Sequence, residues 1–147
     1  MQLDRYEVKI NKSYTEFNFI SEGNLGKIEK SIKYQEMQEG VYNLGFGDKN
    51  PITGEIDDTI VTNNGDMTKI LATVAFSMYL FTKNNPNLWI YVTGSSQSRM
   101  RLYRMAINKY IEEISKDFAI YISLEDGEWY PFQPNTETQE FLIQRQL

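Results

Sequence analysis

The sequence predicts an α+β fold in which an antiparallel, twisted sheet packs against two helices. Three patterns indicate this class: polar and apolar residues alternate in the first third, two later segments carry apolar residues at three- and four-residue spacing, and short apolar runs lie between turn residues. The length of 147 residues suits one domain. We expect that domain to span residues 1–132, followed by a polar C-terminal tail, 133–147, which Phe141, Leu142 and Ile143 could dock.

The first third is typical of a meander of about four strands with one wet face. Tyr6, Val8 and Ile10 alternate with charged residues, and period-two alternation continues through residues 27–38. Turn residues at 22–24 and 39–40 separate the strands, and the last of them runs over 41–46.

A long acidic connection, residues 48–66, follows the meander, and we call it the acidic loop. Its aspartates are Asp48, Asp57, Asp58 and Asp66. Such carboxylates could form ion pairs within the protein or bind a metal ion. The spacing does not fit a calcium loop, because Gly54 sits one place late and no Glu occupies the twelfth position. The structural interpretation is therefore favoured, with a short strand over 55–61 inside the loop.

Two helices follow. The first is predicted over residues 67–83, with Asp66 as its N-cap and Pro86 after its end. It is apolar nearly all round, which is typical of a buried central helix. A compact apolar strand over 88–93 leads to the second helix, 97–116, and a hairpin over 118–132 completes the domain.

The composition excludes several function classes. The chain has no histidine and no cysteine, which excludes imidazole acid–base chemistry and thiolate metal sites, and no cofactor is predicted. The net charge of −5 argues against a general polyanion binder. The N-terminus lacks the apolar run of a secretion signal, and the longest apolar stretch, 70–81, is too short to span a membrane. We expect a cytoplasmic protein that does not contact membranes.

One constellation stands out, and we call it the arginine turn. It consists of Gly94, Ser95, Ser96, Ser98, Arg99, Arg101 and Arg104. Three of the five arginines of the chain thus fall in the first two turns of a helix, whose N-terminus repels cations at a cost of about 0.3–1 kcal/mol each. No Asp or Glu lies between Tyr91 and Ile111 to compensate.

Negative charge that compensates these arginines could come from two sources, a bound anion or the acidic loop. Free N–H groups, serine hydroxyls and guanidinium groups would together receive a phosphate. At about 100° per residue, Arg99 lies beside Tyr103 on the apolar stripe. We therefore expect Arg99 to be partly buried and paired with a loop aspartate. Arg101 and Arg104 face the other way and are the predicted ligand contacts, although Arg101 taken alone is predicted to be a solvated charge.

Several segments of the sequence also resemble a known family. These segments are Phe46-Gly47-Asp48, Asp57-Asp58-Thr59, Asn63-Asn64-Gly65-Asp66, Leu71-Ala72-Thr73-Val74 and Gly94-Ser95 with Arg99-x-Arg101-Leu102-Tyr103-Arg104. Their order resembles that of a family of short, uncharacterised proteins common in Bacteroidota, and the resemblance extends from Asp4 to Phe141. It implies a bacterial, cytoplasmic protein of unassigned function and supplies no catalytic residue.

The leading functional hypothesis is a non-catalytic binding module that takes a phosphate-bearing ligand at residues 94–104. The ligand would be phosphate, a nucleotide or a nucleic-acid backbone. One alternative is a histidine-free nuclease or phosphodiesterase in which Asp57, Asp58 and Asp66 hold magnesium. Another is a homo-oligomer in which the arginines pair with the acidic loop of another subunit. A protein partner is also among the expectations.

Overall fold

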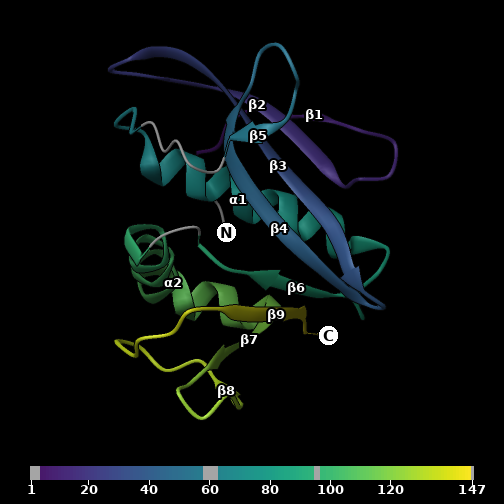
Figure 1. The fold of residues 1–147 in the computed structure, drawn as a ribbon, viewed down its shortest axis with the longest axis vertical. Coiled ribbons are helices and arrows are strands. Elements are labelled where there is room, and N and C mark those ends of the chain that lie inside the picture. The colour runs from purple at the N-terminus through teal and green to yellow at the C-terminus, as the bar shows by residue number, and fades with distance from the viewer. Residues whose placement is uncertain (1–3, 58–62, 95–96, 147) are drawn as a thin grey trace. The chain divides into compact units, whose positions relative to one another are not determined.

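A computed structural model describes residues 4–57, 63–94 and 97–146 (Figure 1). Within these residues it has two helices and a mostly antiparallel set of strands, which confirms the predicted α+β class. The chain forms two compact units, described here one at a time. Unit 1 comprises Met1–Gln35 and Gly45–Asn84, and unit 2 comprises Glu36–Leu44 and Asn85–Leu147.

Unit 1 contains the predicted meander and the first helix. Its strands are β1 (Lys9–Ile10), β2 (Glu16–Gly23), β3 (Gly26–Gln38), β4 (Val41–Lys49) and β5 (Ile56–Asp57), and β3 and β4 also extend into unit 2. The strands are hydrogen-bonded in the order β1-β2-β3-β4, with β5 on β4. The register pairs Phe17 with Ile32 and Phe19 with Lys30, so these side chains share one face of the sheet.

Helix α1 (Met67–Lys83) has the predicted bounds, but its buried stripe contains polar residues. Ile70 and Phe81 are buried together with Thr73 and Ser77, both of which are 0% exposed. The Tyr34 ring stacks on Phe81 with 4.1 Å between centroids, and the Tyr34 and Ser77 hydroxyls lie 2.8 Å apart. The helix tolerates these buried hydroxyls because each also donates to a carbonyl of its own preceding turn.

Residues 63–66, just before α1, lock the turn between β2 and β3. Asn64 is 1% exposed; its side-chain oxygen accepts from the Leu25 N–H at 2.6 Å, and its amide donates to the Gly26 carbonyl at 2.9 Å. Gly23 is required here, since a Cβ at that position would lie 1.9 Å from the Asn64 carbonyl oxygen. The two segments therefore fold against each other as one unit.

Asp66 precedes α1, but its side chain does not cap the helix as predicted. Its carboxylate instead accepts hydrogen bonds from the hydroxyls of Tyr6 and Ser21, both at 2.5 Å. Charge-assisted bonds of this kind are stronger than neutral ones, and they tie α1 to the N-terminal segment and to β2. Burial and the hydrogen bond to Asp66 raise the pKa of Tyr6.

Unit 2 holds the remaining elements. They are β6 (Trp89–Val92), α2 (Gln97–Asp117), β7 (Phe118–Ser123), β8 (Trp129–Pro131) and β9 (Phe141–Arg145). The strand order is β4-β6-β9-β7-β8, in which only the β4–β6 pairing is parallel among these described strands. Helix α2 leads directly into β7.

Strand β9 lies within the predicted polar tail, where docking by Phe141, Leu142 and Ile143 was expected but no strand. Residues 141–145 pair with both β6 and β7, and Phe141 and Ile143 are 0% and 4% exposed. The alternation that buries them is only a few residues long and follows the polar run 133–140. Its partner strands lie at least about 20 residues away along the chain, and such non-local pairing has no local sequence signal.

We predict that Asn64→Ala lowers the free energy of unfolding by about 2–4 kcal/mol, because the buried Asn64 side chain loses its hydrogen bonds to the Leu25 N–H, the Gly26 carbonyl and the Ser21 hydroxyl. The matched control is Asn63→Ala at the neighbouring exposed position, which should cost about 1 kcal/mol or less. Urea unfolding followed by circular dichroism measures both variants. Equal midpoints for the two would contradict the role assigned to Asn64.

We also predict an alkaline loss of stability that depends on Tyr34. Burial raises the pKa of Tyr34 above its ordinary value. Below about pH 10 the hydroxyl is protonated in both states, so its contribution is fully present. At higher pH the unfolded chain releases a proton that the folded chain retains, and stability falls by up to about 1.4 kcal/mol per pH unit.

The variant Tyr34→Phe should show a shallower fall in unfolding free energy above pH 10 than the wild type. It should also lose about 1 kcal/mol at neutral pH, because the bond to Ser77 is gone. Urea titrations at a series of pH values measure both effects. Parallel slopes for the two proteins would contradict the assignment.

Candidate anion-binding site

The arginine turn follows directly from the end of β6. Gly94 lies against the first turn of α2, where its N–H contacts the Met100 sulfur at 2.9 Å. A Cβ at Gly94 would lie 2.9 Å from both the Arg99 Cβ and the Met100 nitrogen. Position 94 therefore requires glycine, because the backbone there lies too close to the first turn of α2 for a side chain. Ser95 and Ser96, two of the predicted site residues, lie outside the described residues.

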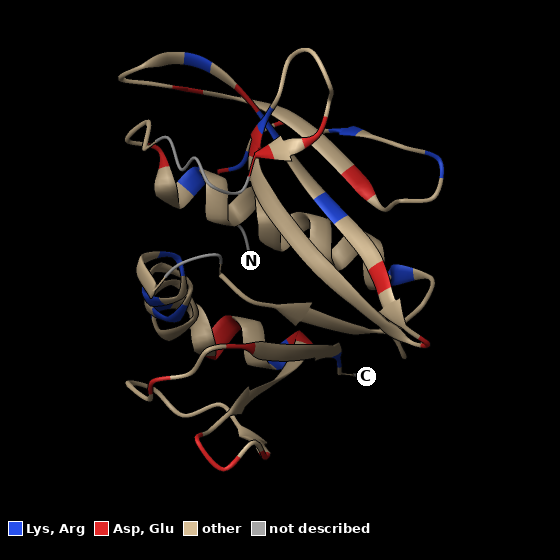
Figure 2. Cartoon of the chain, viewed as in Figure 1, with Lys and Arg blue, Asp and Glu red and all other residues tan. Residues whose placement is uncertain are grey.

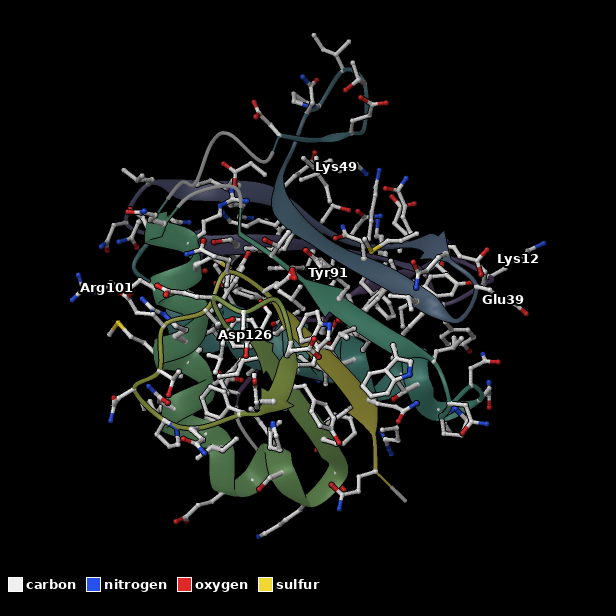
Figure 3. The ribbon with its side chains drawn as sticks, turned by 60° about the horizontal axis from the view of Figure 1, so that its bottom comes forward. Lys12, Glu39, Lys49, Tyr91, Arg101 and Asp126 are labelled. Carbon is white, nitrogen blue, oxygen red and sulfur yellow. The ribbon has the colours of Figure 1, made fainter. Side chains whose placement is uncertain are left out.

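The three arginines differ in exposure. Arg99 is 6% exposed, as its place on the apolar stripe predicted. It lies close enough to Tyr103 for its positive charge to lower the pKa of that hydroxyl, which burial raises by more. The carboxylate partner expected for Arg99 stays a prediction. Arg101 is exposed and projects outward from α2 (Figure 3). Arg104 is half-buried.

Arg101 and Arg104 line a cavity of about 310 Å³. One wall is the start of α2 and the other is the segment that enters β9; the lining residues are Gln97, Ser98, Met100, Arg101, Arg104, Glu137, Thr138 and Gln139. The structure thus brings together Ser98, Arg101 and Arg104 of the predicted site. Gly94 lies against the first turn of α2, and neither Gly94 nor Arg99 is among the residues that line the cavity.

Hydrogen bonds hold the second wall in place. The Thr93 hydroxyl, at the end of β6, donates to the Gln139 carbonyl at 2.9 Å. The buried Thr138 hydroxyl lies 2.9 Å from the carbonyls of both Ser123 and Glu140. The Tyr91 hydroxyl donates to the Glu140 carboxylate at 3.0 Å, and burial together with this bond raises the pKa of Tyr91. The wall is therefore tied to β6 and to the end of β7.

The charges of unit 2 are segregated along α2. Figure 2 shows Lys and Arg gathered in the N-terminal part of the helix, and Asp and Glu in its C-terminal part and in the β7–β8 turn. The N-terminal end of α2 thus carries charge of the sign that its dipole disfavours, whereas its last turn includes the favourable Lys116. At the cavity, the described carboxylate nearest to an arginine is that of Glu137, 4.0 Å from Arg104. That pair is loose, since the Glu137 side chain is 92% exposed.

Sequence reasoning missed the second wall. Glu137, Thr138 and Gln139 were included in the predicted tail, and nothing in their composition marks them as neighbours of the arginine turn. They reach it because β9 pairs with β6, which sets Phe141 opposite Val92. One sequence signal does point to this arrangement. Phe141 and Ile143 are apolar at alternating positions, which is typical of a strand, and a strand here would belong to the sheet.

The acidic loop is engaged within unit 1. Asp48 forms an ion pair of 2.6 Å with Lys30, which is 2% exposed, and Asp57 lies opposite Asp48 in the β4–β5 register. Asp66 accepts from Tyr6 and Ser21, as described above. Asp58 lies outside the described residues. Over the ranges that the structure describes, no three acidic side chains cluster in a way that could hold a metal ion.

The fold and the cavity define the chain as a small α+β protein with a guanidinium-lined cavity beside a helix N-terminus. The chain belongs to DUF6934, a family of unknown function whose model matches residues 2–146. This confirms the resemblance to an uncharacterised family. No curated protein and no solved structure matches the chain. Neither described helix is long and apolar enough to cross a membrane.

We predict that Gly94→Ala destabilises unit 2, since the added methyl group must displace the first turn of α2, at a cost of about 1–3 kcal/mol. The control is Ser98→Ala at an exposed position of the same turn, which should change stability by less than about 0.5 kcal/mol. Thermal and urea unfolding measure the difference. A Gly94→Ala protein as stable as the control would show that the close approach relaxes without cost.

Proposed function

We propose that this protein is a cytoplasmic, non-catalytic binding module that takes a small phosphate-bearing anion in the cavity beside α2. The observation that carries the proposal is that two guanidinium side chains, Arg101 and Arg104, line one cavity that a single loosely held carboxylate, Glu137, partly neutralises. Neither arginine belongs to a tightly packed ion pair among the described residues, so both can turn toward a ligand.

The chemistry of the lining suits an oxyanion. A guanidinium group presents several donors in a planar fork that matches phosphate oxygens. Ser98 adds a hydroxyl in the first turn of α2, where backbone N–H groups and the helix dipole favour negative charge. An anion at this point would also relieve the unfavourable placement of cations at the helix N-terminus.

The size and the overall charge favour a small ligand over a polymer. Cavities for small molecules commonly span about 300–1,000 Å³, and this one, of about 310 Å³, lies at the lower end. The net charge of −5 disfavours a long polyanion, whose affinity grows with each phosphate that is neutralised. Inorganic phosphate, pyrophosphate or a mononucleotide fits both conditions.

Glu137 has a defined part in this proposal. Its carboxylate lies 4.0 Å from the Arg104 guanidinium, at the place where a ligand oxyanion would bind. Because its side chain is 92% exposed, it can swing into solvent at little cost. The ligand would displace it, and its negative charge would weaken binding.

We predict that pyrophosphate binds the wild type and that the double variant Arg101→Ala/Arg104→Ala binds at least about 100-fold more weakly, since charge-assisted hydrogen bonds are lost. Glu137→Gln should bind about three- to tenfold more tightly, because a like charge is removed from the site. Isothermal titration calorimetry at physiological ionic strength measures all three proteins.

The matched control is Lys109→Ala/Lys116→Ala, which removes the same charge from exposed positions farther along α2. At that distance salt screens most of the effect, so we expect a change of less than about twofold. If the lysine and arginine pairs weaken binding equally, the attraction is general and the cavity is not the site. Absence of binding to the wild type would contradict the proposal outright.

A further inference from the structure

The sheet of unit 2 has two faces of different character. On one face, towards the core of the unit, Ile90, Ile122 and Phe141 are at most 1% exposed. The register assigns the alternating residues to the other face, and none of them is buried. We call this face the aromatic platform; it consists of Val41, Asn43, Trp89, Tyr91, Ala119, Tyr121, Ser123, Trp129, Pro131, Leu142 and Gln144.

Four aromatic rings lie across this platform on three strands. Tyr91 and Tyr121 flank Leu142 in one cross-strand row, two strand spacings or about 10 Å apart. The Trp89 and Tyr121 rings are in contact at 5.8 Å between centroids. Trp129, at the edge of the sheet, is 39% exposed. Tyr91, labelled in Figure 3 on β6, is anchored through its hydroxyl to Glu140.

An amide side chain lies beside each ring of β6. Asn43 is the cross-strand neighbour of Tyr91, and Gln144 is that of Trp89. An amide both donates and accepts, and it therefore matches hydroxyl groups, which do the same. The nitrogen of Gln144 also donates to the Asn87 carbonyl at 2.9 Å, which holds this side chain at the surface.

The charge of the platform excludes one class of ligand. None of its residues is Lys or Arg, and Glu140 adds a negative charge at its rim. Surfaces that stack the bases of single-stranded nucleic acids place their rings within a positively charged groove. The platform lacks this electrostatic partner for phosphates.

The size and shape of the platform exclude further classes of binding partner. Five strands about 4.8 Å apart and about five residues long cover roughly 20 by 15 Å, or about 300 Å². A stable protein interface needs about 800 Å² from each partner, so a globular partner or a second copy would bury too little here. Apolar small molecules prefer concave sites, whereas this surface is one face of a sheet.

We infer that the aromatic platform binds a neutral oligosaccharide. A pyranose ring presents a face of C–H groups that packs on the electron-rich face of an aromatic ring, and its equatorial hydroxyls reach sideways to hydrogen-bonding groups. Trp89, Tyr91, Tyr121 and Trp129 provide the stacking surfaces, while Asn43 and Gln144 meet the hydroxyls. This site shares no residue with the proposed anion cavity and does not depend on it.

Affinity electrophoresis tests the inference. The full chain is run through native gels that contain mixed-linkage β-glucan, xylan, galactomannan or dextran, with polygalacturonate and single-stranded DNA as charged probes. We expect at least one neutral polysaccharide to retard the wild type. Trp89→Ala and Tyr121→Ala should each weaken the retardation roughly tenfold, the loss of one stacked ring.

The matched control is Tyr130→Ala. Tyr130 is a 38% exposed aromatic residue that lies on β8 next to Trp129 but opposite Ile122, on the other face of the sheet. This variant and Arg101→Ala/Arg104→Ala should both keep full retardation. If a ring variant does not fold, as judged by thermal unfolding, Asn43→Ala replaces it with an expected severalfold loss.

Three results would overturn the inference. The first is the absence of retardation by every neutral polysaccharide. The second is retardation only by DNA or polygalacturonate. The third is a mass of twice 17.2 kDa in light scattering that Tyr121→Ala reduces to the monomer, because the platform would then be an interface between copies.

Discussion

The pairing of β9 with β6 is the constraint on which unit 2 depends. It fixes Phe141 opposite Val92, and the chain therefore leaves β6 and enters β9 at the same end of the sheet. Helix α2 begins just after one strand, and Glu137–Gln139 lie just before the other. The cavity between them follows from this single pairing, and the bond from the Thr93 hydroxyl to the Gln139 carbonyl ties its second wall to β6. The same pairing completes the buried face of the sheet and leaves the aromatic platform on the other.

The segments that carry the family resemblance divide into two kinds. Asn64 and Asp66 have an architectural role, since their side chains join the β2–β3 turn, the N-terminal segment and α1. Asp48 is likewise occupied by the buried Lys30. In the arginine turn, Gly94 and Arg99 are packed inside, whereas Arg101 and Arg104 line a cavity without a comparable structural task. This contrast separates residues that build the fold from residues that line the cavity of the proposed site.

Periodicity predicted most of the elements of this fold, including the bounds of α1 and the burial of Arg99 on α2. It failed where tertiary partners decide the outcome. Asp66 has an N-cap position and an N-cap residue type, yet two hydroxyls that are distant in sequence compete successfully for its carboxylate. Thr73 and Ser77 are polar by type but buried, because their hydroxyls bond inside the helix. The second wall of the cavity could not be predicted, because it depends on a strand pairing between distant segments.

The most direct measurement of the central claim locates the anion. In arginine-selective NMR spectra of the full chain titrated with pyrophosphate, the Nε–Hε signals of Arg101 and Arg104 and the backbone amide of Ser98 should shift together and saturate. The signals of Arg5 and Arg145 should stay in place. If all five arginines shift gradually without saturation, or if Arg101 and Arg104 do not respond, the cavity is not an anion site and the account of its function is wrong.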